Sequence, residues 1–378
     1  MAIYLDHAAT TPMHPAAIDA YSRQMAEVGN ASSLHAQGRA VRKSVEESRE
    51  LIARAAGCDA SEIIFTSSGT EANNLAIKGL FWADPSKKTI VLSSIEHHAI
   101  VDPVEWLVSH EGAKAIFAPV SSEGILDLVS LAKIVEENRE DIALISVMHS
   151  NNEVGTLQPI VEVVKIAAGI PVHTDAVQSF GKVVFDYKAL GVTSATISAH
   201  KLGGPLGVAA LILKRGMDIT PLLHGGGQER DIRSSTVNAP GIISFATAVD
   251  QALMNMNENS HRMNELRSKL RSAISTSVPD ARVNGSFDAS LPTIVNVTFP
   301  GTKNEGLLVL LDMAGISASQ GSACSAGVQR PSHVLLAMGL SESEADSTVR
   351  FSLGFTSTEE DISALRSVIA DVVKKAKI

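Results

Sequence analysis

Hydrophobic and polar positions follow two alternating patterns from about residue 40 to residue 215. Apolar residues between 41 and 56 recur at helical spacing, and Gly57 follows as a helix stop. The run 142–148 is apolar except for Ser146, which is typical of a strand covered on both faces of a parallel sheet. Further short strands are expected at 62–66, 89–93, 172–176, 195–198 and 208–213. Strands that alternate with helices over this length predict a doubly wound α/β layer.

The pattern changes after about residue 240. Met263, Leu266, Leu270 and Ile274 lie at helical spacing and predict a long amphipathic helix. The elements expected after it are a strand, a helix, a second strand and a final helix, at 294–299, 305–314, 349–353 and 359–377. This mixture predicts a smaller α+β unit that follows the α/β layer.

Two domains are therefore expected. The large α/β domain would span residues 15–250, and the small α+β domain would combine residues 1–14 with residues 251–378. Within the small domain, 317–330 consists mostly of Ser, Ala, Gly and Gln without periodicity. Such a stretch predicts an exposed, mobile loop, and Cys324 lies in its middle.

Composition narrows the class of protein. The 378 residues are 45% hydrophobic and 19% charged, which is a globular balance. The net charge of −9 disfavours a protein that holds nucleic acid by its own bulk charge. No apolar run approaches a membrane span and no secretory signal is visible, so we expect a cytoplasmic protein with no membrane partner. Two Cys residues cannot form a disulfide framework, which favours a reducing compartment and a free thiol.

Two motifs at predicted strand ends allow more than one interpretation. Ser68 and Glu71 have capping-box spacing, which predicts a helix N-cap and leaves open an anion site at the same helix start. His173 and Asp175 share one face of a buried strand. They could form a metal pair, form a structural ion pair, or direct a carboxylate at the ring nitrogen of a ligand. The 12 His residues show no metal-ligand spacing, so no metal is expected.

Lys201 follows another buried strand and precedes a Gly-rich turn. A lysine is usually a solvated surface charge, but one at a strand end in a tight turn is well placed to attack a carbonyl. Together with Asp175 it matches the requirements of pyridoxal phosphate. The lysine forms the Schiff base, and the acid keeps the pyridine nitrogen protonated.

The order of these motifs along the chain resembles that of the cysteine desulfurases of bacterial housekeeping type, in the class V aminotransferase family. The segments that carry the resemblance are 4–12, 29–33, 65–74, 96–97, 148–155, 175–178, 198–201, 224–236, 321–324 and 350–354. It implies a fold-type I pyridoxal-phosphate transferase, with a doubly wound α/β domain on a mainly parallel sheet and a smaller α+β domain. It also implies removal of sulfur from L-cysteine, which gives L-alanine and a persulfide on Cys324.

The resemblance implies a role for each matching residue around pyridoxal 5′-phosphate. Lys201 would carry the cofactor and shuttle protons, and His97 would stack on the ring and take part in catalysis. Asp175 would pair with the pyridine nitrogen and Gln178 with the ring oxygen. The other residues implied to bind the cofactor are Gly69, Thr70, Asn152, Ser198, Ala199 and His200, with Thr236 reaching the phosphate of the neighbouring subunit. A homodimer is therefore implied.

The substrate carboxylate would be held by Arg350 and Asn152, and Asn30 belongs to the same implied substrate-binding set. A guanidinium fork matches the two oxygens of a carboxylate, which is the physical reason for Arg at this position. Asn152 could otherwise be a turn residue. Cys324 would be the catalytic nucleophile, whereas Cys58, just after a helix, is expected to be structural.

Two departures from the family pattern concern partners. Leu206 stands where the family usually has a Lys, which removes a cation near the site entrance. The chain stops at Ile378, whereas housekeeping members carry a further tail that docks an iron–sulfur scaffold. The expected sulfur acceptor is therefore a protein, either an iron–sulfur scaffold or a tRNA-thiolating enzyme. The acidic charge implies that the partner, rather than this chain, binds any tRNA.

Three alternatives share parts of this site. A selenocysteine lyase or a class V aminotransferase would use Lys201 and Asp175 without needing Cys324. An inactive scaffold is disfavoured, because both Lys201 and Cys324 are present.

Overall fold

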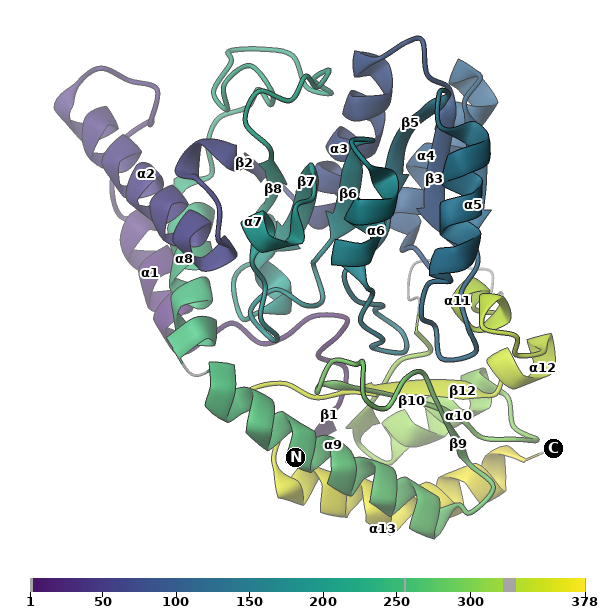
Figure 1. Ribbon diagram of the computed structural model, residues 1–378. Helices are drawn as coiled ribbons and strands as arrows, with labels where there is room; N and C mark the ends of the chain where they lie inside the picture. Colours follow the sequence, from purple (N-terminus) through teal and green to yellow (C-terminus); the bar gives the residue numbers. More distant parts are fainter. Residues whose placement is uncertain (1–2, 255, 322–330, 378) are drawn as a thin grey trace.

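The computed structural model describes residues 3–254, 256–321 and 331–377, and Figure 1 shows two units stacked one above the other. The upper unit is built on a seven-stranded sheet in the order β2-β8-β7-β6-β5-β3-β4. Its strands are β2 (Ile63–Thr66), β3 (Thr89–Ser93), β4 (Lys114–Ala118), β5 (Ile142–Ser146), β6 (Val172–Asp175), β7 (Ser194–Ser198) and β8 (Ala209–Leu213). β8 pairs antiparallel with β2 and β7, and the remaining pairs are parallel.

Helices cover both faces of this sheet (Figure 1). One face carries α3 (Gly69–Ala83) and α4 (His98–Glu111), and the other carries α5 (Leu128–Asn138), α6 (Ile160–Ala167) and α7 (Tyr187–Leu190). Near the β2 edge, α8 (Ala239–Met254) packs against α1 (Pro15–Met25) and α2 (Ala36–Ala56). Two short 3₁₀ turns, η1 (Ala60–Glu62) and η2 (Ala199–Lys201), adjoin β2 and β7. Buried side chains form separate clusters on the two faces, so the predicted doubly wound fold is confirmed.

The lower unit contains a three-stranded antiparallel sheet in the order β12-β10-β9. These strands are β9 (Arg282–Asn284), β10 (Ile294–Thr298) and β12 (Thr348–Ser352). The helices are α9 (Met256–Ser277), α10 (Asn304–Met313), α11 (His333–Ala337), α12 (Glu342–Ala345) and α13 (Glu359–Ala376). A two-stranded parallel pair joins β1 (Ile3–Tyr4) to β11 (Ile316–Ser317), which ties the start of the described chain to this unit.

Local sequence explains the long helices of the lower unit. Met263, Leu266, Leu270 and Ile274 all lie on α9 and are buried, as their spacing predicts. The α13 helix begins after Thr358, whose side chain accepts a hydrogen bond from the Asp361 N–H. Its first turn is acidic and its last turn basic, and both ends complement the helix dipole.

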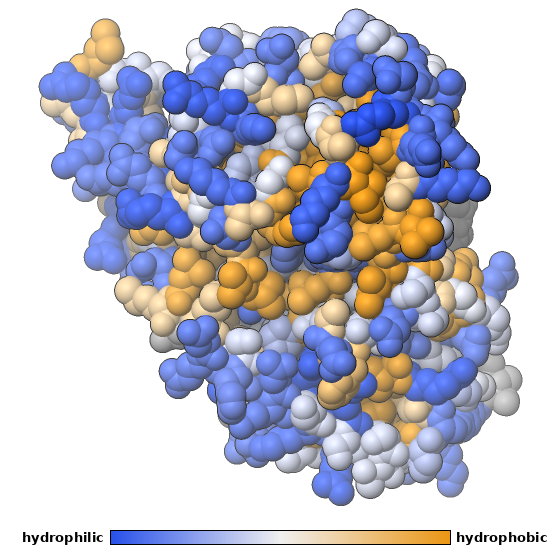
Figure 2. Space-filling view, in the orientation of Figure 1, coloured by the Kyte–Doolittle hydropathy of each residue, from blue (hydrophilic) through white to orange (hydrophobic). Residues whose placement is uncertain are grey.

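The face of the molecule in Figure 2 carries both polar and apolar side chains. Apolar side chains gather along the junction between the two units and over the region of α5 and α6. Exposed apolar residues of these two helices include Val129 and Val161. Among the residues that the structure describes, no helix has the length and apolarity that crossing a membrane requires.

Candidate active site

The carboxyl ends of the parallel strands border a cavity of about 290 Å³. β6 ends at Asp175, β7 ends at Ser198, and β2 leads to the start of α3 at Gly69. Arg350 of β12 also lines the cavity, which therefore lies between the upper sheet and the lower unit. Ligands of open α/β sheets bind at this edge. The predicted residues that line it are Gly69, Thr70, His97, Asn152, Asp175, Gln178, Ser198, His200, Lys201 and Arg350.

The remaining predicted residues lie elsewhere. Asn30 is exposed, and its side chain accepts a hydrogen bond from the Ser32 N–H. Thr236 is exposed and lines a separate cavity beside Ser67. Ala199 is fully buried next to Lys201. Cys324 lies outside the described residues.

Asp175 is held by a chain of polar side chains that starts on the next strand. Its Oδ2 accepts from Asn73 Nδ2 at 2.7 Å, and its Oδ1 accepts from the Val177 N–H at 2.9 Å. Because the amide nitrogen of Asn73 is used in this way, its Oδ1 must accept from His173 Nε2, 3.1 Å away. Nδ1 of His173 then accepts from Ser194 Oγ at 2.8 Å. Each donor in this chain points toward the carboxylate.

The three alternatives for His173 and Asp175 can now be compared. Burial lowers the pKa of His173 to about 3, so the ring is neutral and forms no ion pair. Within the described ranges, no group of three or more His, Cys, Asp or Glu side chains could hold a metal ion. The arrangement favours the remaining alternative, a carboxylate directed at a ligand. Asn73, which the sequence analysis missed, provides the link between the two residues.

Lys201 and Gln178 meet at one backbone carbonyl. Lys201 Nζ donates to the Ala8 and Ala9 oxygens at 2.6 and 2.7 Å. Gln178 Nε2 donates to the same Ala8 oxygen at 2.9 Å. The N-terminal segment therefore forms part of the cavity wall. The turn after Lys201 needs glycine, since a Cβ on Gly204 would lie 2.8 Å from the Ala199 Cβ.

The start of α3 has a side-chain N-cap and backbone N–H groups that have no partner within the helix. Ser68 Oγ accepts from the Glu71 N–H at 3.1 Å, so the predicted N-cap is present. The first N–H groups of a helix have no intrahelical partner, and here they adjoin the cavity at Gly69 and Thr70. Ser150 also lines the cavity, and its buried Oγ has no hydrogen-bond partner in the described chain. These groups can accommodate an anionic ligand.

Glu96 and His97 precede α4, and His97 is its N-cap and lines the cavity. Nδ1 of His97 accepts from the Ala99 N–H at 3.0 Å, and burial is the main cause that lowers its pKa. Glu96 is fully buried, and its Oε1 accepts from the Met148 N–H at 2.6 Å. Burial raises the pKa of Glu96 well above its usual value, with Asp175 adding to the effect. His97 is therefore a neutral ring at neutral pH, and Glu96 is a carboxyl group held against ionisation.

Arg350 is 2% exposed, which rules out a surface ion pair. One terminal nitrogen donates to the backbone oxygens of Asn152 and Gly321 at 2.8 and 2.9 Å, and the other donates to Asp6 at 2.9 Å. Its Nε is buried without a partner among the described residues. Asn152 lies in a turn that Asn151 stabilises, since Asn151 Oδ1 accepts from two backbone N–H groups, and Asn152 also lines the cavity.

The free thiol of Cys58 is buried, as expected of a structural residue. Burial, together with nearby Glu62 and Asp59, raises the pKa of Cys58 to about 12. This thiol is therefore unreactive at neutral pH.

Comparison with known proteins places the chain in a family. The family model "Aminotransferase class-V" matches residues 3–365, and the chain belongs to this family. Pyridoxal 5′-phosphate is the cofactor of the family. The chain is 46% identical over 381 residues to "IscS-like cysteine desulfurase" of Mycobacterium tuberculosis, a match that covers 99% of this chain and 97% of that protein. It is 40% identical to "Cysteine desulfurase NifS" of Azotobacter vinelandii, over 99% and 93% of the two chains.

Solved structures agree with this assignment. A structure titled "NIFS-LIKE PROTEIN" is similar with a TM-score of 0.92 and 36% identity, over 99% of this chain and 100% of that one. A second, "SspA in complex with cysteine", has a TM-score of 0.78 and 33% identity, over 93% and 98% of the two chains. The fold-type I architecture predicted from the sequence is confirmed.

Proposed function

We propose that this chain is a pyridoxal-phosphate-dependent cysteine desulfurase, which converts L-cysteine to L-alanine and passes the sulfur through Cys324 to an acceptor. The observation that carries the proposal is the single cavity that combines Lys201, Asp175 and Arg350 with the start of α3. Full-length similarity to proteins named cysteine desulfurases supports the same reaction.

The donor set of the cavity fits the cofactor. Asp175 would hold the proton of the ring nitrogen, and Gln178 would donate to the ring oxygen with its second N–H. The phosphate would be bound by Gly69, Thr70, Ser198 and His200. When bound through Lys201, the cofactor supplies an electron-withdrawing ring next to the substrate Cα. Ser150 Oγ provides a further buried donor that a bound group would satisfy.

Arg350 would bind the substrate carboxylate from the opposite wall. Its Nε–H is a buried donor without a partner in the described chain. A buried donor that makes no hydrogen bond destabilises the folded protein. Asp6 already fixes one terminal nitrogen, so the guanidinium is oriented before substrate arrives. A carboxylate at Nε, beside Asn152, would complete the hydrogen bonding of this side chain.

Proton and sulfur transfer would then use three residues. The Lys201 amine would take the proton from the substrate Cα, and neutral His97 would hold or return protons at the cavity wall. The Cys324 thiolate would attack the substrate sulfur, so that an S–S bond forms while the C–S bond breaks. The electron pair of that bond goes to the substrate carbon skeleton, which is protonated to give L-alanine. Cys324 follows Gly321, a cavity residue, by three positions.

The partners and organisation are inferred on the same basis. A cytoplasmic homodimer in which Thr236 reaches the phosphate of the neighbouring subunit would explain why Thr236 lies exposed and outside the cavity. The large domain would comprise 15–250 and the small domain 1–14 with 251–378, in keeping with separate buried clusters in the two units. The sulfur acceptor would be a protein, either an iron–sulfur scaffold or a tRNA-thiolating enzyme.

Cys324→Ala tests the function directly. The variant holoenzyme should keep the visible absorbance of the bound cofactor but release neither alanine nor sulfide from L-cysteine with a thiol present. Wild-type enzyme should release the two in equal amounts, and Cys58→Ala should do the same, because that thiol is buried and protonated. Sulfide release by Cys324→Ala at the wild-type rate would overturn the proposal and point to a lyase that needs no cysteine.

A further inference from the structure

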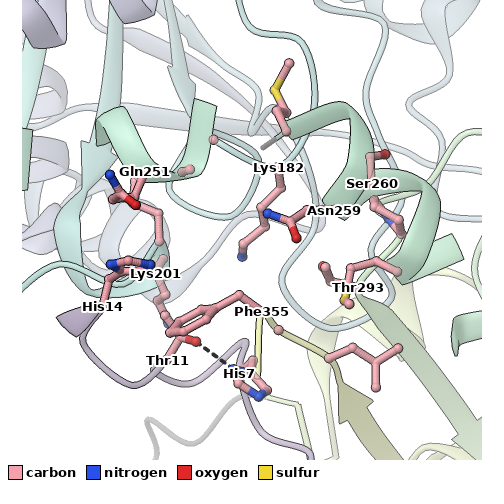
Figure 3. A pocket seen from close by; sticks show the side chains of 18 residues that line it. His7, Thr11, His14, Lys182, Lys201, Gln251, Asn259, Ser260, Thr293 and Phe355 are labelled. Atoms are coloured by element: carbon pink, nitrogen blue, oxygen red, sulfur yellow. Dashed lines mark hydrogen bonds between the residues drawn. The ribbon is translucent and has the colours of Figure 1, made fainter. Parts of the chain in front are cut away.

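A second cavity, of about 240 Å³, adjoins the cofactor site at Lys201, and Figure 3 shows its lining. We call it the rear cavity, and its lining includes His7, Lys182, Gln251, Asn259, Thr293 and Phe355. Lys201 lines both cavities and so belongs to the wall between them. The residues of the rear cavity come from the segment after β6, from α8 and α9, and from loops next to β10 and β12. None of the roles derived above accounts for this space.

The described lining of the rear cavity contains bases but no Asp or Glu. The bases are Lys182, Lys201, His7 and His14, and burial keeps His7 neutral by lowering its pKa to about 4. The whole chain carries 41 acidic and 32 basic side chains, with a net charge of −9. A space lined only by basic and neutral groups is therefore unexpected in this protein, and its local potential favours an anion.

The Lys182 amine can donate more hydrogen bonds than it makes to described residues. Its Nζ donates to Gln178 Oε1 at 3.3 Å, whereas a lysine ammonium has three N–H donors. No salt bridge joins Lys182 to a carboxylate within the described residues. Burial, then the positive charges of Lys201 and Arg350, lower the pKa of Lys182 to about 7. An anion beside the amine would offset the cost of a positive charge at this position.

Thr293 gives a second, independent indication of a ligand. Its side chain is 5% exposed and lines the rear cavity, yet its buried Oγ1 has no hydrogen-bond partner in the described chain. In Figure 3 the Lys182 amine points into the open space, and Asn259 and Thr293 lie together on one side of it. A hydroxyl, an amide and an amine around one space form a donor set suited to an oxyanion.

We propose that the rear cavity is a binding site for a small carboxylate, held by Lys182 and Thr293. The volume corresponds to roughly eight water molecules in the liquid, which suits an acid of a few carbon atoms. The basic lining disfavours a ligand with its own positive charge, such as the ammonium group of an amino acid. The site is thus chemically distinct from the substrate site at Arg350.

Occupancy of the rear cavity is connected to the cofactor site. Lys182 donates to Gln178, Gln178 donates to the Ala8 oxygen, and Lys201 donates to that same oxygen. A carboxylate bound to Lys182 places a negative charge one hydrogen bond away from Gln178. The visible absorbance of the bound cofactor should therefore change when the rear cavity fills.

Acetate is the probe for this site, with its binding to the holoenzyme measured by calorimetry and by the line width of its ¹³C signal. We expect one saturable site for each chain that persists with saturating L-alanine, because alanine occupies the Arg350 site and cannot fill the rear cavity. Lys182→Met should weaken acetate binding at least about tenfold, and Thr293→Val by a smaller factor. Lys182→Arg should retain binding, and each variant is checked by thermal melting.

The matched control is Lys188→Met, which removes an exposed lysine that pairs with Asp59 outside the cavity. It should leave acetate affinity unchanged. The proposal is wrong if wild-type holoenzyme shows no saturable acetate site, if L-alanine displaces the acetate, or if Lys182→Met binds acetate as well as wild type does. These outcomes are independent of desulfurase activity, because the measurement needs no turnover.

Discussion

The two cavities on either side of Lys201 differ in how their charges are balanced. In the cofactor cavity, each charged group described has a partner of fixed geometry: Asp175 accepts from Asn73 and Val177, and Arg350 donates to Asp6. In the rear cavity, Lys182 has only an amide oxygen as its hydrogen-bond partner in the described chain. The first site has the fixed geometry that we propose for the cofactor, whereas the second holds an amine whose hydrogen bonding a small anion would complete.

The largest expected effect separates the two lysines. Lys201→Ala should abolish the visible band of the covalently bound cofactor and lower alanine formation at least about a hundredfold. Lys182→Met should keep that band, because its amine reaches the site only through Gln178. A visible band that survives in Lys201→Ala would place the cofactor-binding lysine elsewhere and remove the basis of the comparison.

Arg350→Lys should produce the next largest effect. Lysine keeps the positive charge but cannot present a fork, so kcat/KM for L-cysteine should fall roughly tenfold to a hundredfold, mainly through KM. Cofactor affinity should change far less, since Arg350 contacts the implied cofactor residue Asn152 only at its backbone oxygen. Loss of the cofactor in this variant, measured by absorbance after dialysis, would contradict the assignment of Arg350 to the substrate.

Asn73→Ala tests the chain of donors behind Asp175. Without the amide, Asp175 loses one of its two fixed donors and His173 loses its acceptor, so cofactor binding should weaken roughly tenfold. The control is Asn74→Ala, an adjacent residue whose side chain donates only to the Thr70 oxygen of its own helix. Fluorescence titration of the two apoproteins with cofactor measures both. Equal cofactor affinities of the two variants would mean that the hydrogen bonds from Ser194, His173 and Asn73 have no influence on Asp175.

The smallest expected effect concerns acid stability of the upper unit. Burial lowers the pKa of His149 to about 4, against about 6.5 for the unfolded chain. Between these two pH values the unfolded state binds a proton that the folded state does not. Stability should therefore fall as pH falls through this window, with His149 contributing up to about 1.4 kcal/mol per pH unit.

His149→Phe should make that dependence shallower in urea titrations between pH 6.5 and pH 4. The ring already packs against Phe185, with 5.5 Å between centroids, so an apolar replacement suits the site. His110→Phe, at an exposed position stacked on Trp106, is the control and should leave the slope as it is. An unchanged slope in His149→Phe would show that this histidine is charged in the folded protein.

The buried strands could be predicted because their apolar runs are long and are bounded by turns. β4 was missed, since this edge strand mixes exposed Lys114 and Phe117 with two partly buried residues and only one buried residue, Ala118. Strand ends with Asp175 and Lys201 were predicted from local pattern alone. Asn73 and Asp6 could not be, because their partners lie 102 and 344 residues away in sequence. Such contacts depend on the completed fold.

The rear cavity could not be predicted from the sequence, for the same reason. It is built from segments that no local motif connects, and Lys182 carries no signal that distinguishes it from a surface lysine. The predicted positions Asn30 and Thr236 illustrate the opposite limit. Their motifs suggested a site, but within one chain both are exposed and lie outside the cofactor cavity.

The most direct test of the central claim is to locate the transferred sulfur. Holoenzyme is given one equivalent of L-cysteine without a thiol acceptor, and its peptides are analysed by mass spectrometry under non-reducing conditions. The account predicts one additional sulfur atom on the peptide that contains Cys324 and none on the peptide that contains Cys58. An additional sulfur on Cys58, or alanine formation with no sulfur on either cysteine, would contradict it.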